Sequence, residues 1–144
     1  MSEGVYAGYM TILITSGGTI VKIDDVRHIA NFSNGEFPSQ IARECLLIGH
    51  KVIYLHARGA RKPFCRELTF DPAKPAGPQF KGLLKTQKIF RKLQKNIRYV
   101  EFVEFSDYAK SLEQILRTED IDIAFLGAAV SDYGIEYMPG KISS

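Results

Sequence analysis

Two glycines and a threonine, Gly17-Gly18-Thr19, follow directly on an apolar run at residues 11–15. A short run rich in β-branched residues predicts a strand, and paired glycines at its end predict a turn where the backbone closely approaches another group. The carboxyl end of the first strand of an open α/β sheet is a place where phosphates and nucleotides bind. Glycine amides can face an anion there and Thr19 adds a hydroxyl, although a plain turn explains these residues equally well.

A second polar stretch, Asn-Phe-Ser-Asn-Gly at residues 31–35, lies just before a predicted helix. Ser33 or Asn34 could cap that helix, which is the simpler interpretation. Alternatively, a phosphate binds at the helix N-terminus, where Ser33 and Gly35 supply donors. The amide of Asn31 would then lie slightly outside this phosphate site and could hold a carboxylate or a carbonyl group.

Small residues follow the last predicted strand, in the sequence Ala-Ala-Val-Ser-Asp-Tyr at residues 128–133. Small side chains at a strand end admit a ligand against the backbone. Asp132 could contact a nucleotide, a metal or an amide, or it could simply cap a helix. Further on, Lys141 lies in a loop next to a glycine, where a cation could stabilise negative charge in a phosphoryl or acyl transition state. A lone lysine is otherwise a surface charge.

The elements that must position these residues are strands that alternate with helices. This alternation predicts right-handed crossovers and an α/β fold, Rossmann-like, with three α/β/α layers and a mainly parallel central sheet. A long polar loop is expected at residues 23–35, and Ser106 is the expected N-cap of the later helix. The predicted strands are residues 11–15, 51–56, 99–105 and 121–127, the last of them central, and the predicted helices are residues 37–48 and 107–117.

The middle of the chain carries no motif of this kind. Residues 58–82 contain several prolines and little periodicity, which predicts an extended surface loop. Residues 81–98 have helical periodicity and many basic residues with no acidic residue among them. They form either a surface that attracts phosphates or nucleic acid, or a crossover helix with a solvated basic face. The apolar residues on one face of this stretch are Leu83, Phe90, Leu93 and Ile97.

Composition limits the class of protein. The 144 residues are 45% hydrophobic and 24% charged, which is typical of one globular domain. We expect a disordered lead at residues 1–9 and a single domain over residues 10–144. The net charge of +3 is too small to require nucleic acid as a partner. Cys45 and Cys65 form neither a disulfide framework nor a metal-binding spacing, so a reduced, cytoplasmic setting is expected. No apolar run reaches the length of a membrane span.

Taken together, the motifs resemble those of the phosphopantothenate–cysteine ligases, and they occur in that family's order. The resemblance implies a ligase of coenzyme A biosynthesis that joins 4′-phosphopantothenate to L-cysteine through an acyl-nucleotide, with CTP or ATP and Mg²⁺. The matching pieces are Thr15-Ser16-Gly17-Gly18-Thr19, Ile23-Asp24, Val26-Arg27, Asn31-Phe32-Ser33-Asn34-Gly35, Ala128-Ala129-Val130-Ser131-Asp132-Tyr133 and Lys141-Ile142-Ser143-Ser144.

The resemblance also implies roles for individual residues. Arg27 resembles the arginine that reaches the substrate phosphate from the neighbouring subunit of a homodimer. Asn31 and Lys141 are the implied catalytic residues, and Lys141 resembles a mobile-loop lysine that assists the activation step. The implied nucleotide contacts are Gly17, Gly18, Thr19, Ser33 and Gly35, and the implied substrate contacts are Arg27, Asn31, Ala128, Ala129 and Asp132.

Two departures from the family pattern leave alternatives open. Pro38 stands where the family has a second glycine, and proline has no N–H to donate to a phosphate. Family members also continue beyond the lysine loop, so we expect a domain that is truncated after Ser144. The alternative is a non-catalytic or degenerate homologue that binds a nucleotide or phosphopantothenate. A third hypothesis, an amidohydrolase with Thr19 as nucleophile, lacks the second threonine–aspartate motif that it needs.

Overall fold

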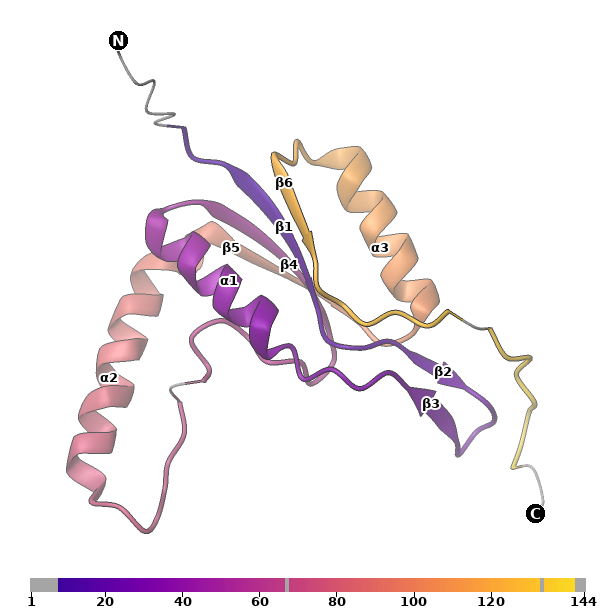
Figure 1. Cartoon of the computed structure of the whole chain (residues 1–144), viewed down its shortest axis with the longest axis horizontal. Coiled ribbons are helices and arrows are strands. Elements are labelled where there is room, and N and C mark those ends of the chain that lie inside the picture. The colour runs from indigo at the N-terminus through magenta and orange to yellow at the C-terminus, as the bar shows by residue number, and fades with distance from the viewer. Residues whose placement is uncertain (1–7, 67, 133, 142–144) are drawn as a thin grey trace.

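The computed structural model describes residues 8–66, 68–132 and 134–141, and a four-stranded parallel sheet lies at its centre (Figure 1). All four predicted strands are present. Among the described strands β6 pairs with β1 alone, so the expectation that the last strand is central stays a prediction. The order across the sheet is β5 (Ile97–Phe102), β4 (Lys51–Ala57), β1 (Thr11–Ser16) and β6 (Ile123–Leu126).

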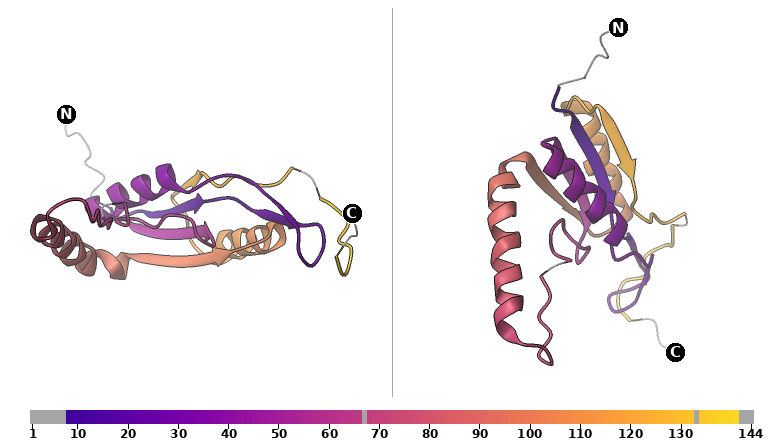
Figure 2. Two further views of the ribbon diagram at one scale, coloured as in Figure 1. Left: turned by 90° about the horizontal axis from the view of Figure 1, so that it is seen from below. Right: turned by 60° about the vertical axis from the view of Figure 1, so that its left-hand side comes forward.

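Helices cover both faces of this sheet, which confirms the three-layer α/β/α fold (Figure 2). The helix α1 (Glu36–Ile48) packs against alternate residues of β1 and β4, such as Ile14, and α2 (Ala76–Leu93) adds partly buried side chains such as Phe90 to the same core. The intervening residues, such as Leu13, face α3 (Phe105–Thr118). This two-residue alternation buries both faces of the central strands. None of the helices in the described residues is both long and apolar enough to cross a membrane.

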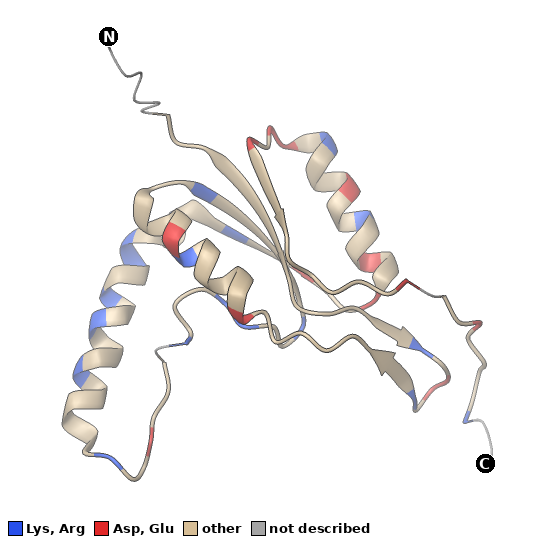
Figure 3. Cartoon of the chain, in the orientation of Figure 1, with Lys and Arg blue, Asp and Glu red and all other residues tan. Residues whose placement is uncertain are grey.

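The basic helix α2 begins earlier than predicted. Its first residue is Ala76, so the expected surface loop at residues 58–82 is wrong for its last seven residues. Pro75 is the N-cap, and a proline is tolerated in a first helical turn, where its missing N–H would have had no partner. The helix ends at Leu93, and β5 begins soon after it. Since α2 connects the parallel strands β4 and β5, it is a crossover helix. Lysines and arginines are spread along it, as Figure 3 shows.

The start of α3 also differs from the prediction. Its N-cap is Glu104 instead of Ser106, and β5 ends at Phe102, before the predicted strand end. Glu104 and Asp107 form a capping box: the side chain of Glu104 accepts the backbone N–H of Asp107, and the side chain of Asp107 accepts the backbone N–H of Glu104. This reciprocal arrangement satisfies two amides at the helix start and therefore fixes the boundary.

A short antiparallel hairpin projects from the sheet and was missed, because part of it lies in the predicted loop at residues 23–35 (Figure 1). Its strands are β2 (Ile20–Lys22) and β3 (His28–Ala30). The buried carboxylate of Asp24 closes its turn, since it accepts the backbone N–H groups of Val26 at 2.8 Å and Arg27 at 2.7 Å. Strands of three residues are too short to give a readable alternation.

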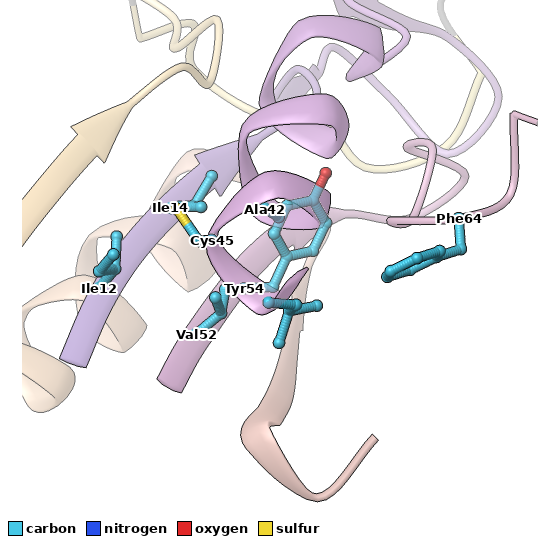
Figure 4. Close-up of a cluster of buried hydrophobic side chains, with 8 residues drawn as sticks. Ile12, Ile14, Ala42, Cys45, Val52, Tyr54 and Phe64 are labelled. Carbon is cyan, nitrogen blue, oxygen red and sulfur yellow. The ribbon is translucent and has the colours of Figure 1, made fainter. Parts of the chain in front are cut away.

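The hydroxyl of Tyr54 ties the loop after β4 to the end of β1. Its ring lies in the core among the side chains of Figure 4, and the residue is fully buried. The hydroxyl oxygen is 2.8 Å from the Arg61 carbonyl oxygen and 2.9 Å from Ser16 Oγ. A carbonyl oxygen can only accept, so Tyr54 donates to Arg61 and Ser16 donates to Tyr54. Burial raises the pKa of Tyr54 to about 12.

Pro38 is a buried residue of the first turn of α1, where it packs on Gly127 beyond the end of β6. A Cβ atom added to Gly127 would lie 2.6 Å from Pro38 Cγ and 3.0 Å from the Thr15 carbonyl oxygen. The residue that departs from the family pattern therefore has a packing role, since it brings α1 against the strand end.

Alkaline pH tests the burial of Tyr54. We expect the free energy of unfolding to fall as pH rises from about 10 to about 12, because the folded state keeps this phenol protonated where the unfolded chain ionises it. In a titration of tyrosinate absorbance, Tyr54→Phe should remove one high-pH step and the exposed Tyr9→Phe should keep it. Burial also raises the pKa of Tyr99 to about 12, so its step should remain, and an unchanged amplitude near pH 12 in Tyr54→Phe would contradict the assignment.

Two glycine substitutions test the contact between α1 and β6. We expect Gly127→Ala to lower the free energy of unfolding by about 1–3 kcal/mol, because the added carbon overlaps Pro38. The matched control is Gly82→Ala in α2, where a Cβ would meet nothing within 4 Å. It should raise stability by roughly 0.5–1 kcal/mol. Urea unfolding measures both, and a neutral Gly127→Ala would show that the contact is loose.

Candidate functional site

The backbone of Thr19 joins the three segments that carry the sequence motifs. Its N–H donates to the Ala129 carbonyl at 3.0 Å, and its carbonyl accepts the Asn31 N–H at 3.1 Å. The Ala129 N–H in turn donates to the Gly17 carbonyl at 2.8 Å. The predicted residues Gly17, Asn31 and Ala129 are thus brought together at the carboxyl ends of β1 and β6.

Side chains complete this arrangement around the fully buried Thr19 hydroxyl. The Ser131 N–H donates to Thr19 Oγ1 at 2.9 Å. The Asn31 Nδ2 atom lies 3.3 Å from Thr19 Oγ1, 3.1 Å from Ser131 Oγ and 3.4 Å from the Ala129 carbonyl oxygen. We call these four residues, Thr19, Asn31, Ala129 and Ser131, the Thr19 network.

The orientation of the Asn31 amide follows from its neighbours. Because the Ala129 carbonyl can only accept, the amide atom beside it must be the NH₂ group. The NH₂ group therefore donates within the Thr19 network. Among the described residues no hydrogen bond to the amide oxygen of Asn31 is found, so this oxygen is the acceptor that Asn31 can offer to a ligand.

The close approach predicted for the two glycines is made by the protein itself. A side chain on Gly18 would overlap the Asn31 carbonyl. Gly17 has φ of 84°, and its added Cβ would lie 2.6 Å from Ala57 Cβ and 2.8 Å from Ala60 Cβ. Thr19 is buried and hydrogen-bonded, so its hydroxyl supports the turn and is not placed as an accessible nucleophile.

The N-terminus of α1 lies beside this turn. Its N-cap is Gly35, in the left-handed region, and not Ser33 or Asn34. Asn34 still supplies a side-chain acceptor, since its Oδ1 accepts the Glu36 N–H at 3.0 Å, and Pro38 has no N–H. Within the described residues, this leaves the amides of Gly35 and Phe37 to face an anion, with the half-buried Ser33 nearby.

The loop after β4 forms a further wall that sequence reasoning missed. The Arg61 N–H donates to the Asn34 carbonyl at 2.9 Å, and Ala60 packs close to Gly35. The Glu36 carboxylate lies between two guanidinium groups, with Arg61 Nε at 2.9 Å and Arg66 Nε at 3.2 Å. The arginines offset the negative charge at the helix start. The small pair Gly59-Ala60 after a strand is the one signal that could have indicated this wall.

A cavity of about 580 Å³ lies between β2, the start of α3 and residues 131, 132, 134, 135 and 137. Ser131 belongs both to the Thr19 network and to the wall of this cavity, and the exposed Asp132 lines it as well. Across the cavity, Lys22 and Glu104 form an ion pair at 2.9 Å. In the part of the chain that the structure describes, no group of three or more His, Cys, Asp or Glu side chains could hold a metal ion.

Arg27 and Lys141 lie at the projecting hairpin and outside the Thr19 network. Arg27 donates to the Asp24 carboxylate through Nε at 3.0 Å and Nη2 at 2.8 Å. The neighbouring Asp25 carboxylate accepts the Gly140 N–H at 2.9 Å and the Tyr137 hydroxyl. Asp25 therefore holds the segment that carries the exposed Lys141 against the hairpin.

Comparisons with known proteins point to one family. Residues 8–68 match the family model of the DNA/pantothenate metabolism flavoprotein C-terminal domain. The phosphopantothenate–cysteine ligase CAB2 of Saccharomyces cerevisiae is 30% identical over 144 residues, which cover 88% of this chain and 40% of the relative. Phosphopantothenate–cysteine ligase 1 of Arabidopsis thaliana is 40% identical over 63 residues, which cover 42% of this chain and 20% of the relative.

Solved structures agree with the sequence relatives. A Cab2 mutant in complex with phosphopantothenate-cysteine is 28% identical, with a TM-score of 0.77 over 88% of this chain and 47% of that one. The chain thus spans less than half of the full-length proteins that it matches. Over the part that they cover, these matches support the phosphopantothenate–cysteine ligases as the family of this partial chain.

Proposed function

We propose that the chain binds 4′-phosphopantothenate and a nucleoside triphosphate as part of a phosphopantothenate–cysteine ligase. The observation that carries the proposal is the Thr19 network, which gathers the family's motifs at the carboxyl edge of a parallel sheet. That edge is where ligands of open α/β sheets bind. The family relatives are ligases, and the Cab2 mutant was solved with phosphopantothenate-cysteine.

The proposed reaction has two steps. A carboxylate oxygen of 4′-phosphopantothenate attacks the α-phosphorus of CTP or ATP, and the bond to pyrophosphate breaks. The cysteine amine then attacks the acyl carbon of this mixed anhydride, the nucleoside monophosphate leaves, and the amine proton passes to solvent. Holding both reactants in one site converts each step into an intramolecular one. Mg²⁺ enters as the nucleotide complex, because magnesium is usually bound by substrate phosphates with one or two carboxylates.

The roles of the residues follow from their positions. The phosphates face the start of α1, where the helix dipole favours an anion. Asn31 offers its amide oxygen to a ligand N–H, while its NH₂ group holds the motifs together. In this proposal Thr19 and Gly18 support the turn. The direct nucleotide contacts are Gly17, Ser33 and Gly35, and the direct substrate contacts are Asn31, Ala128, Ala129 and Asp132.

Two cations lie on the hairpin side of the proposed site. We assign Arg27 to the substrate phosphate of a neighbouring subunit in a homodimer, because it lies on a hairpin that projects from the sheet (Figure 1). Lys141 is assigned to the activation step, in which it stabilises the charge that develops on the phosphates. Asp25 is a positioning residue for Lys141, since it binds Gly140 directly before it.

Calorimetric titration of the chain tests the proposal. We expect binding of 4′-phosphopantothenate and of CTP–Mg²⁺ or ATP–Mg²⁺, and pyrophosphate release when both substrates are present. Binding without pyrophosphate release would favour the second candidate, a non-catalytic binding homologue, which the missing N–H of Pro38 supports. Absence of binding to all of these ligands would overturn both candidates.

Substitutions in the Thr19 network should weaken substrate binding. We expect Asn31→Ala and Ser131→Ala each to raise the Kd for 4′-phosphopantothenate about tenfold, equivalent to about 1.4 kcal/mol, because each removes hydrogen bonds that join the motifs. The control is Asn96→Ala, in the turn before β5. Equal Kd values for all three variants and the unsubstituted chain would remove Asn31 and Ser131 from the site.

Substitution of Lys141 should slow chemistry and spare binding. We expect Lys141→Gln to lower the rate of pyrophosphate release about 100- to 1000-fold with little change in nucleotide Kd. The exposed lysine variant Lys110→Gln in α3 is the control. Asp25→Asn should lower the rate less, and Lys141→Gln/Asp25→Asn should be no slower than Lys141→Gln, because the two residues act as a unit. Additive losses would separate them.

A further inference from the structure

An apolar groove of about 540 Å³ runs between α2 and residues 62–65 and 68 of the preceding loop. No residue of α2 is buried, and Phe80 and Leu84 on its outer side are 54% and 65% exposed. Large apolar side chains are therefore uncovered along this helix in the described structure, well away from the Thr19 network. The apolar lining residues are Phe64, Leu68, Phe80, Leu83, Leu84 and Phe90.

The loop side of the groove has a fixed shape. Phe64 is the one residue other than glycine, among those described, with a positive φ, at 66°. Such a backbone costs about 1–3 kcal/mol and persists only where packing holds it. Here the buried Phe64 ring packs against Phe90 at 5.7 Å between centroids, and the Arg43 guanidinium lies 5.4 Å from the ring centroid. The groove is thus formed before any partner arrives.

A row of lysines runs along α2 and into the 3₁₀ turn after it, and Lys81 and Lys88 are helical neighbours of Leu84, which lines the groove. The spacing alternates between four and three residues, so these side chains share one side of the helix. From residue 72 to residue 100 the chain has no acidic residue, and Figure 3 accordingly marks no acidic position on α2. The lysine row consists of Lys81, Lys85, Lys88, Lys92 and Lys95.

We propose that this groove and the lysine row bind an acidic amphipathic helix of another protein. Apolar side chains of that helix fill the groove, and its Asp and Glu residues face the lysine row, which is the usual helix-in-groove mode with charge complementarity. The proposal is independent of the ligase chemistry, since neither the groove nor the lysine row touches the Thr19 network.

Other occupants fit less well. In a two-fold contact between copies of this chain through α2, the lysine rows would face each other and repel. A membrane surface could bind the lysines and the exposed Phe80 and Leu84, but it would not fill a concave groove. A nucleic acid would use the lysines and leave the apolar lining uncovered.

Peptide selection tests the proposal. A displayed library of 16-residue peptides is selected on the chain and counter-selected on Leu84→Glu, whose folding is checked by circular dichroism. We expect the enriched peptides to be acidic and amphipathic. A synthetic copy of one should bind at least tenfold more weakly to Leu84→Ala and to Lys85→Glu/Lys88→Glu. Leu116→Ala, at a residue 54% exposed on α3, should bind it as the unsubstituted chain does. The peptide should also protect Cys65, which lines the groove, from maleimide labelling.

Several outcomes would overturn the proposal. The first is that no peptide is enriched over the counter-selection. The second is that the enriched peptides carry no acidic residues. The third is that the peptide binds the groove variants as tightly as it binds the unsubstituted chain. Self-association in light scattering that Leu84→Glu abolishes would assign the groove to a second copy. Sedimentation with phosphatidylcholine–phosphatidylserine vesicles that Leu84→Glu abolishes, without peptide enrichment, would assign it to a membrane.

Discussion

The hydrogen bonds around the buried Thr19 hydroxyl are the interaction on which the proposed site depends. This one oxygen accepts the Ser131 N–H and lies within hydrogen-bond distance of the Asn31 amide, so it joins segments more than a hundred residues apart in sequence. A buried polar group is stable only when it is hydrogen-bonded. In the Thr19 network the hydrogen-bond partners of each buried polar group come from the other residues of the network. Gly18 is part of the same constraint, because a side chain there would occupy the position of the Asn31 carbonyl.

The parts of the fold that could be predicted are those with a strong apolar pattern. β1 and β4 are buried on both faces, so their long apolar runs located them to within a residue at either end. The hairpin β2–β3 could not be found in this way, because its strands are short and the contacts of Asp24 hold its turn. The early start of α2 was hidden by Pro75 and Pro78, which read as loop residues although a first helical turn accepts them.

The candidate site was predictable as a set of segments but not as a set of contacts. The carboxyl ends of parallel strands converge, which is why the residues after β1 and β6 meet. Sequence could not indicate that the glycine turn would be filled by Asn31, Ala57 and Ala60, because close packing of small residues has no periodic signal. The loop after β4 was missed for the same reason, and its arginines emerged as partners of Glu36 only in three dimensions.

The position of β6 in the described sheet has a consequence for how that sheet can be extended. Among the described strands it pairs with β1 alone, and its side chains Ile123, Phe125 and Leu126 are 39%, 40% and 65% exposed. A parallel edge of this kind presents backbone groups that can extend the sheet with a strand from another polypeptide. Among the described strands, β6 is therefore a position at which a further strand, of the same protein or of another polypeptide, can extend the sheet.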